Sequence, residues 1–307
     1  MDEFSVIAAF FKSLQSNRSG IVDLSIGDDA ALLAMSSDYQ LVISTDSMVE
    51  GVHFLPDWPA EVIAYKLLAT NVSDMAAMAA TPKCISLAMT LPEINEQWLH
   101  AFSAGLKSAM DRFNVDLIGG DLTKGSMTLT LTIHGWVEKN KAIRRSTAQA
   151  GDLIYISGEL GAGAYGVSQL GKKSYDDLVF NKLFYPVPRI DYCSILQNYA
   201  NSAIDISDGL SSDLSHILHA SGVGAELYAE KLTGKYPVEQ AVNSGDEYEL
   251  CFTVPPCYRQ AVEVAMEQQA LDYYLIGTVT QQQKFILINE DGSQRELKPR
   301  GFQHFGE

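Results

Sequence analysis

Acidic clusters recur along this chain, and each follows a short apolar run where a strand is expected to end. The clusters are Gly27-Asp28-Asp29, Ser44-Thr45-Asp46, Gly119-Gly120-Asp121 and Asp205-Ile206-Ser207-Asp208. A fifth acid, Asp74, lies in an Ala- and Met-rich helical segment. Crowded carboxylates are unfavourable away from water unless a cation neutralises them, and no Arg or Lys set accompanies these. Oxygen ligands without His or Cys suit Mg²⁺, which commonly accompanies bound phosphates, so the pattern predicts a phosphoryl-transfer enzyme.

Length and charge narrow the class of protein further. The 307 residues are enough for two domains, and a composition of 47% apolar and 20% charged residues is that of a globular protein. The net charge of −16 argues against a nucleic-acid or anionic-membrane partner. The sequence contains no apolar run of about 18 residues, and its start lacks the positive charge of a signal peptide. The four scattered cysteines predict reduced thiols and a cytoplasmic protein.

Predicted strands alternate with helices in both halves of the chain, which indicates an α/β architecture. A polar seam at 144–152 separates the halves, so domains are expected at 1–147 and 148–307. Helices are predicted at 5–16, 60–80, 96–113, 163–170, 210–221 and 256–269, and strands at 41–43, 115–118, 127–137, 153–156, 203–206, 248–254, 273–279 and 284–289.

Each local motif also has a plainer interpretation. Gly161-Ala-Gly163-Ala-Tyr-Gly166 follows a strand, but no second strand ending in an acid follows within about 20 residues, which disfavours a dinucleotide site. A glycine turn that approaches a phosphate stays open there. Gly119 and Gly120 predict a tight turn at a strand end, either beside an anion or merely capped by Asp121. Ser207 or Asp208 could cap the following helix, although a cap does not explain Asp205.

Five motifs taken together resemble those of the thiamine-monophosphate kinases, in the aminoimidazole-ribonucleotide-synthetase-like superfamily. They are GDDA at 27–30, STD at 44–46, NVSDMAAM at 71–78, IGGDLT at 118–123 and DISDGL at 205–210. The resemblance covers essentially the whole chain. It implies the superfamily's two-domain fold of the α/β (α+β) type. The N-terminal domain would bind ATP and Mg²⁺ and pair its sheet with that of a second copy in a homodimer, and the C-terminal α/β domain would complete the active site.

The resemblance also implies an activity, namely ATP-dependent phosphorylation of thiamine monophosphate to thiamine diphosphate with several Mg²⁺ ions. The residues that match the family's metal ligands are Asp29, Ser44, Thr45, Asp46, Asp74, Asp121, Asp205 and Asp208. Those that match ATP contacts are Gly120, Asp121, Arg145 and Ser207, and those that match substrate contacts are His53, Asp246 and Phe302. Of these, Asp46, Asp121 and Arg145 are expected to act in catalysis.

The chain departs from the family at one motif. Where the family has Gly-Gly-Glu-Asp-Tyr-Glu-Leu, this chain reads Ser244-Gly-Asp246-Glu247-Tyr-Glu-Leu250, so the two acids are exchanged. The shorter carboxylate at Asp246 or the longer one at Glu247 then contacts the substrate, and the sequence leaves both open.

The expected mechanism is direct in-line transfer. The acceptor is a phosphate monoester whose oxygen is already anionic, so positioning and charge neutralisation matter more than a general base. One rival is another ATP-using enzyme of the superfamily, such as selenophosphate synthetase or aminoimidazole ribonucleotide synthetase. The former uses a reactive residue in an N-terminal glycine-rich segment, and this chain has no cysteine before Cys84. A rival from a different class is a non-catalytic nucleotide- or thiamine-binding module.

Overall fold

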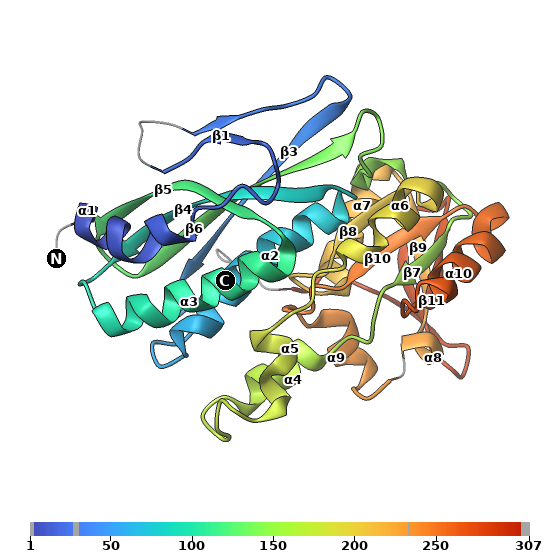
Figure 1. The fold of residues 1–307 in the computed structure, drawn as a ribbon. Helices are drawn as coiled ribbons and strands as arrows, with labels where there is room; N and C mark the ends of the chain where they lie inside the picture. Colours follow the sequence, from blue (N-terminus) through green and yellow to red (C-terminus); the bar gives the residue numbers. More distant parts are fainter. Residues whose placement is uncertain (1–2, 27–30, 233, 302–307) are drawn as a thin grey trace. The chain divides into compact units, whose positions relative to one another are not determined.

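The structure, a computed structural model, describes residues 3–26, 31–232 and 234–301 (Figure 1). The chain divides into two units. Unit 1 comprises Met1–Met75 with Ala80–Asn140, and unit 2 comprises Ala76–Ala79 with Lys141–Glu307. Each unit is described by itself.

Unit 1 is built on a four-stranded sheet with the order β3-β6-β4-β5. Strand β6 runs antiparallel to both β3 and β4, whereas β4 and β5 are parallel. The bounds are β1 Val22–Leu24, β2 Leu32–Leu33, β3 Tyr39–Val49, α2 Ala60–Ala77, β4 Thr81–Leu91, α3 Glu96–Phe113, β5 Asp116–Lys124 and β6 Thr128–Glu138.

The two faces of this sheet are covered differently. Helices α2 and α3 lie against one face, onto which β6 directs the fully buried Leu129, Leu131 and Ile133 (Figure 1). The small hairpin of β1 and β2 covers the other face, where Ile21 and Val22 pack on Cys84 and Ile118. Alternation along β6 predicted this division, because successive side chains of a strand point to opposite faces.

Two of the expected strand ends are wrong. Ser44-Thr45-Asp46 lies inside β3, and Gly119-Gly120-Asp121 lies inside β5. The glycines make no turn there, since neither has a positive φ. Gly120 is instead required by a close approach, because a Cβ atom on it would lie 1.9 Å from the carbonyl oxygen of Leu87. Polar residues are tolerated inside these strands because β3 and β5 are the two edges of the sheet.

Other elements of unit 1 also differ from expectation. The helix expected at 5–16 is divided into α1 (Glu3–Val6), a π-helical turn η1 (Ile7–Phe11) and a 3₁₀ turn η2 (Lys12–Leu14). The sequence pattern does not predict strand β4, because Thr81-Pro82 after a helical segment is typical of a helix end. Proline is tolerated at the first residues of a strand, and the β4 register is irregular between Pro82 and Cys84.

Unit 2 contains a seven-stranded sheet with the order β13-β12-β9-β11-β7-β10-β8. Its strands are β7 Leu153–Ile156, β8 Ser202–Asp205, β9 Gly224–Tyr228, β10 Leu250–Val254, β11 Tyr274–Thr280, β12 Phe285–Ile288 and β13 Gln294–Glu296. Its α-helices are α4 Ala162–Gln169, α5 Asn181–Phe184, α6 Cys193–Tyr199, α7 Leu210–Ser221, α8 Ala229–Leu232, α9 Val238–Asn243 and α10 Arg259–Gln268, and its 3₁₀ turns are η3 Arg145–Thr147, η4 Leu178–Phe180, η5 Ile190–Tyr192 and η6 Pro256–Tyr258.

Helices cover both faces of the larger sheet. On one face Ile154 and Ile156 of β7 pack with Leu214 of α7. On the other face Tyr155 stacks on Phe252 of β10, with ring centroids 5.6 Å apart, above Met266 of α10. The strands of this sheet are antiparallel except for β12 and β9, so the loops that follow them lie at both ends of the strands.

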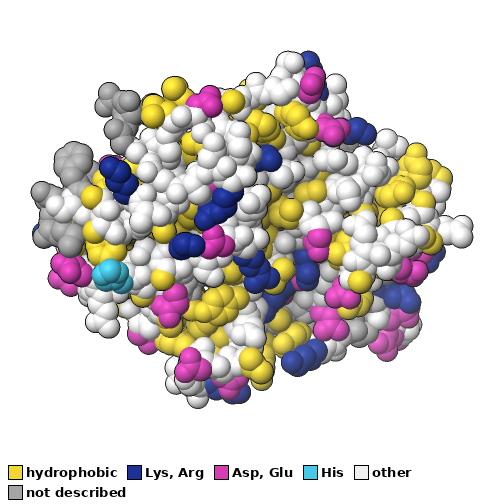
Figure 2. Space-filling view, viewed as in Figure 1, with side chains coloured by type: hydrophobic (Ala, Val, Ile, Leu, Met, Phe, Trp, Pro, Cys, Tyr) yellow, Lys and Arg dark blue, Asp and Glu magenta, His cyan; other side chains and the backbone are white. Residues whose placement is uncertain are grey.

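The surface carries both signs of charge, and Lys and Arg side chains are interspersed with Asp and Glu on the face drawn in Figure 2. Among the helices that the structure describes, none is long and apolar enough to cross a membrane.

Candidate active site

Three predicted metal ligands of unit 1 meet between β3 and α2. Ser44 and Asp46 are two residues apart in β3 and therefore point to the same face. The Ser44 Oγ donates a hydrogen bond of 2.5 Å to Oδ2 of Asp74 in α2. Burial, together with the charge of Asp74, raises the pKa of Asp46 to about 6. Two carboxylates that repel each other in a half-buried site, beside the Ser44 hydroxyl, fit a hard divalent cation.

The third residue of that motif points the other way. The Thr45 Oγ1 lies 2.9 Å from Oγ1 of Thr132, and Ser47 makes a similar bond of 2.7 Å with Thr130. The side chain of Thr45 therefore lies on the face of the sheet opposite to Asp46. The role of Thr45 as a metal ligand stays a prediction, and the position of its side chain in unit 1 does not favour that role.

Asp121 lies apart from Asp46 within unit 1. In the register of the sheet, Asp121 faces Ala88, which faces Thr130, which faces Ser47. Asp121 therefore shares the face of Ser47, and the two edge strands are about 14 Å apart, since neighbouring strands are spaced by about 4.8 Å. Within a single unit 1, these two predicted ligands do not come together.

Asp121 instead lines a pocket of about 830 Å³. Backbone and side chains of β4 and β5, including Gly119 and Gly120, form part of its lining. Ile7 and Phe11 of the N-terminal segment contribute apolar side chains. The volume and the apolar lining with a few polar groups are typical of a site for a ligand of nucleotide size.

The N-terminal segment is held over this pocket by Asp116, which sequence reasoning missed. Its fully buried carboxylate accepts bonds from Ser16 Oγ (2.5 Å), Arg18 N (2.9 Å), Ser19 N (2.8 Å) and Ser19 Oγ (2.6 Å). Burial alone would raise the pKa of Asp116, but these hydrogen bonds outweigh it and the pKa is lowered. The partners lie almost a hundred residues away, so no local signal marks this acid.

Unit 2 carries the second acidic set on the loop after β8. Asp205 is the last residue of β8 and is 5% exposed. The alternative that Ser207 or Asp208 caps α7 is wrong, because the N-cap residue is Gly209, which has no side chain to cap the helix. Instead Asp213, inside α7, accepts bonds at Oδ2 from the backbone N–H groups of Asp208 (3.1 Å) and Gly209 (3.0 Å). The two backbone bonds hold the loop in shape. This leaves the Asp208 carboxylate out of the capping role.

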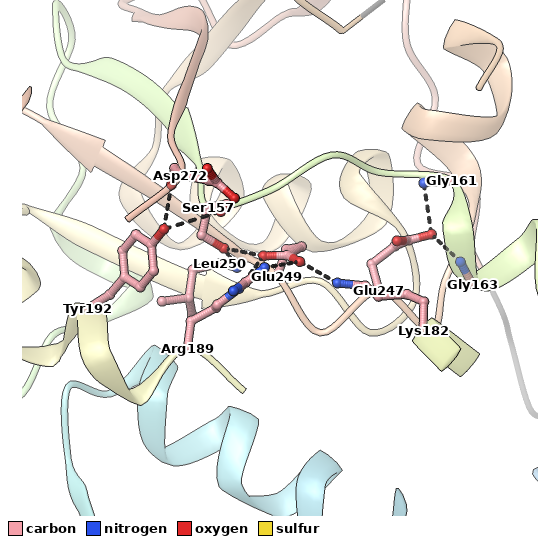
Figure 3. A network of polar contacts seen from close by, with 10 residues as sticks. All are labelled: Ser157, Gly161, Gly163, Lys182, Arg189, Tyr192, Glu247, Glu249, Leu250 and Asp272. Carbon is pink, nitrogen blue, oxygen red and sulfur yellow. Dashed lines mark hydrogen bonds and ion pairs between the residues drawn. The ribbon is translucent and has the colours of Figure 1, made fainter. Parts of the chain in front are cut away.

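The exchanged acids 246 and 247 have different surroundings. Glu247 is fully buried, and its Oε1 accepts bonds from the N–H groups of Gly161 (2.8 Å) and Gly163 (3.0 Å) (Figure 3). The carboxylate of Asp246 accepts a bond of 3.0 Å from the Tyr248 hydroxyl. Burial raises the pKa of Glu247 to about 7. The glycine N–H groups that might have held a phosphate are thus occupied by Glu247, and this geometry favours Asp246 as the substrate contact.

A buried ionic cluster lies beside Glu247. The Glu249 carboxylate accepts bonds from Ser157 Oγ (2.6 Å) and from Arg189 Nε (2.6 Å), and it also pairs with Lys182 (Figure 3). Although burial acts to raise the pKa of Glu249, the two cations lower it below its usual range. Breaking such a buried pair costs several kcal/mol, about 3–5 in comparable cases, so this cluster fixes the segment around it. Sequence reasoning did not identify it.

The remaining predicted residues are spread over both units. His53 accepts a bond of 2.9 Å at Nδ1 from the Val49 N–H, so a neutral ring carries its proton on Nε2. Arg145 is exposed in η3, and its carbonyl accepts a bond of 2.9 Å from Ser221 Oγ. Asp29 and Phe302 lie outside the described residues. Within the described ranges, no three His, Cys, Asp or Glu side chains form a ready-made metal cluster.

Family models match most of the chain. The model described as AIR synthase related protein, N-terminal domain, matches residues 27–137. The corresponding C-terminal domain model matches residues 149–289.

Curated relatives match over their full length. The thiamine-monophosphate kinase of Haemophilus influenzae is 43% identical over 328 residues, covering 100% of this chain and 99% of the relative. That of Escherichia coli K12 is 41% identical over 319 residues, covering 99% of this chain and 98% of the relative.

Solved structures agree with these matches. The thiamine-monophosphate kinase of Stenotrophomonas maltophilia K279a superposes with a TM-score of 0.83 at 35% identity, covering 95% of this chain and 98% of that one. AaThiL complexed with AMPPCP and TMP gives a TM-score of 0.77 at 31% identity, covering 99% and 97%. E. coli HypE, 19% identical with a TM-score of 0.82, shares the fold.

Proposed function

The chain belongs to the thiamine-monophosphate kinase family, and we propose that it transfers the γ-phosphoryl group of ATP directly to thiamine monophosphate. The products are ADP and thiamine diphosphate. The observation that carries this proposal is full-length similarity of 41–43% to kinases of that name. A 31% identical relative is described as complexed with AMPPCP and TMP. Both acidic sets that the reaction needs are present.

Several Mg²⁺ ions are proposed as the metal. In unit 1, Ser44, Asp46 and Asp74 would hold an ion, and in unit 2 Asp205 and Asp208 offer further carboxylates. The raised pKa of Asp46 supports this assignment, because burial and the charge of Asp74 both disfavour the ionised carboxylate, and a bound cation would stabilise it. When bound, the ions would neutralise charge on the phosphates. Asp29, Thr45 and Asp121 are proposed as further ligands, although Thr45 and Asp121 lie on the face of the sheet opposite to Asp46.

The chain's own residues bind and orient the reactants. The acceptor oxygen is anionic, so no residue is needed to remove a proton from it. Gly120 lacks a side chain and lines the pocket proposed for ATP, with Asp121 beside it. Arg145 and Ser207 would donate hydrogen bonds to the ATP phosphates.

The thiamine monophosphate would contact His53, Asp246 and Phe302. A carboxylate at Asp246 suits a ligand with a cationic ring and an amino group. Phe302 would cover the cationic ring, a cation–π contact worth about 0.5–2 kcal/mol. In this proposal residues 1–147 bind ATP and Mg²⁺, and residues 148–307 complete the site.

A homodimer is proposed from the edge of the sheet in unit 1. Strand β3 is eleven residues long and pairs with β6 alone among the described strands. It exposes 41% of Leu41 and 56% of Ile43. A long apolar edge strand is a template for pairing with another chain, and a second copy would cover it. We place this dimer in the cytoplasm, in keeping with four free cysteines.

A coupled ADP-release assay tests the proposed reaction. With Mg-ATP, ADP is expected only when thiamine monophosphate is added, and mass spectrometry should find thiamine diphosphate in equal amount. Chelation of Mg²⁺ by EDTA should stop turnover, and added Mg²⁺ should restore it. ADP release without thiamine monophosphate would point to another ATP-using enzyme of the superfamily. Nucleotide binding with no ADP would point to a binding module.

A further inference from the structure

The segment 245–248 of unit 2 has an unusual backbone. Asp246 and Tyr248 have φ values of +61° and +51°, in the left-handed region. Aspartate tolerates this region, but a bulky aromatic residue rarely adopts it. Conformations of this kind persist only where the surroundings fix them, and they gather at ligand sites.

Contacts on both sides fix this segment. The N–H of Asp246 donates to the Ser207 carbonyl and the N–H of Tyr248 to the Ile206 carbonyl, both at 2.8 Å. These bonds tie the segment to the loop that carries Asp205 and Asp208. Glu247 anchors it from within through its bonds to Gly161 and Gly163.

The packing at the glycine turn leaves little freedom. A Cβ atom on Gly163 would lie 2.6 Å from the carbonyl oxygen of Asp246. A Cβ atom on Gly245 would lie 2.4 Å from the carbonyl oxygen of Ser207. The backbone on either side of Asp246 therefore contacts the chain at Gly163 and at Ser207, and these contacts determine its position.

The side chain of Glu247 points away from those of Asp246 and Tyr248. Glu247 is directed into unit 2, whereas the Tyr248 hydroxyl reaches Asp246 and donates to its Oδ1 at 3.0 Å. Tyr248 is 9% exposed, so its ring is held by packing and its hydroxyl has a fixed direction. The bond restrains the Oδ1 atom of the Asp246 carboxylate.

We propose that Tyr248 is a positioning residue that aims the Asp246 carboxylate at the phosphate-acceptor substrate, with Glu247 anchoring the segment that bears both. This role rests on the proposed function, and it concerns binding of the acceptor, not the transfer step. It also accounts for the exchanged acids: the longer side chain reaches the glycine turn, and the shorter one stays beside the tyrosine.

The test is Tyr248→Phe, which removes one oxygen and keeps the ring. Because the lost hydrogen bond orients the Asp246 carboxylate and does not itself contact the substrate, KM for thiamine monophosphate should rise about 5- to 20-fold. The kcat and the KM for ATP should stay within about twofold. Tyr273→Phe is the matched control, because the Tyr273 hydroxyl also donates to a carboxylate, Glu267, at 2.9 Å on the surface of the same unit. Its KM values should not change.

A double-mutant cycle separates positioning from general support of the fold. If Tyr248 acts through Asp246, Tyr248→Phe should have no further effect on KM in an Asp246→Gly background, which has no side-chain oxygen for the Tyr248 hydroxyl to bond. Glycine is chosen because it tolerates a positive φ. Additive effects of the two substitutions would overturn the role.

Glu247 gives a second, independent variant. Glu247→Gln keeps an oxygen that can accept the N–H bonds of Gly161 and Gly163, whereas Glu247→Ala removes it. KM for thiamine monophosphate should rise in the alanine variant and be largely restored in the glutamine variant. Equal KM values in both would overturn the anchoring role.

The outcomes also separate this inference from the proposed function. A wild-type protein that releases no ADP in response to thiamine monophosphate overturns the reaction itself, and the role of Tyr248 with it. An active wild type whose Tyr248→Phe variant keeps its KM overturns only the role of Tyr248.

Discussion

Asp46 shows at the scale of one residue what a bound cation would change in the site. Its pKa is about 6 in the folded chain against 3.8 for an ordinary aspartate. The fold therefore binds the proton more tightly than the unfolded chain does, and stability falls as pH rises from about 4 through 6. Above pH 7 the charged pair with Asp74 opposes folding, which a bound cation would relieve.

Asp46→Asn should therefore stabilise the metal-free protein at high pH. We expect a gain of about 1–2 kcal/mol in the free energy of unfolding at pH 8. This is less than the free energy that corresponds to the full pKa shift, because water reaches the half-buried site and screens the charges. At pH 5 the gain should be about half as large, because Asp46 is then mostly protonated in the folded chain but mostly ionised in the unfolded chain. Urea unfolding at both pH values measures it, with the exposed Asp38→Asn as the control.

The same variant should lose its response to metal. Added Mg²⁺ should raise the melting temperature of the wild type more than that of Asp46→Asn, and kcat should fall about a hundredfold or more. A variant with wild-type turnover and an unchanged Mg²⁺ response would contradict the assignment of Asp46 as a ligand.

The residues that sequence reasoning missed share one property. Asp116 and Glu249 interact with partners that the fold brings near, such as Ser16, which is 100 residues from Asp116, and Ser157, which is 92 residues from Glu249. The resemblance located Asp46 and Asp74 because their motifs are continuous in sequence. It left Asp246 and Glu247 open, since only the buried contacts of Glu247 distinguish the two.

At the scale of elements, helices were predicted better than the sheet of unit 1. The bounds of α3 and α7 agree with expectation because each has a clear amphipathic period. Strands β3 and β5 extend beyond the predicted ends, because edge strands accommodate polar residues and Gly120 serves a close contact. Such features depend on neighbouring strands, which a local pattern does not contain.

The prediction at the scale of elements concerns Asp116, which holds the N-terminal segment through Ser16, Arg18 and Ser19. Asp116→Asn removes the charge that accepts four hydrogen bonds, so the free energy of unfolding should fall by about 2–3 kcal/mol at pH 7. Because the folded pKa of Asp116 is lowered, its contribution is present at neutral pH and is lost as pH falls below about 4. KM for ATP should rise, because Ile7 and Phe11 line the pocket.

Urea unfolding and steady-state kinetics check this prediction. Asp111→Asn is the control, since Asp111 pairs with Arg18 of the same segment at 2.5 Å but on the surface. It should change neither quantity appreciably. An Asp116→Asn variant as stable as the control would show that Asp116 does not hold the segment in place.

At the scale of the whole molecule, the exposed edge of β3 predicts association. The wild type should have a mass of about 67 kDa in solution by light scattering, twice the 33.6 kDa of one chain. Ile43→Lys places a charge on the apolar edge and should give a monomer.

Val52→Lys is the matched control for that variant, because Val52 is 52% exposed and lies outside β3. It should stay dimeric. A wild type with the mass of one chain would remove the homodimer from the account.

The central claim is direct transfer from ATP to thiamine monophosphate, and a single-turnover experiment with γ-labelled ATP tests it most directly. Excess enzyme is mixed with labelled ATP and Mg²⁺, with and without thiamine monophosphate, and the label is followed in protein and in small molecules. The account predicts that label enters thiamine diphosphate in step with ADP formation and never remains on the protein. Label retained on the protein after incubation with ATP alone would contradict direct transfer, and label that enters only inorganic phosphate would contradict the kinase assignment.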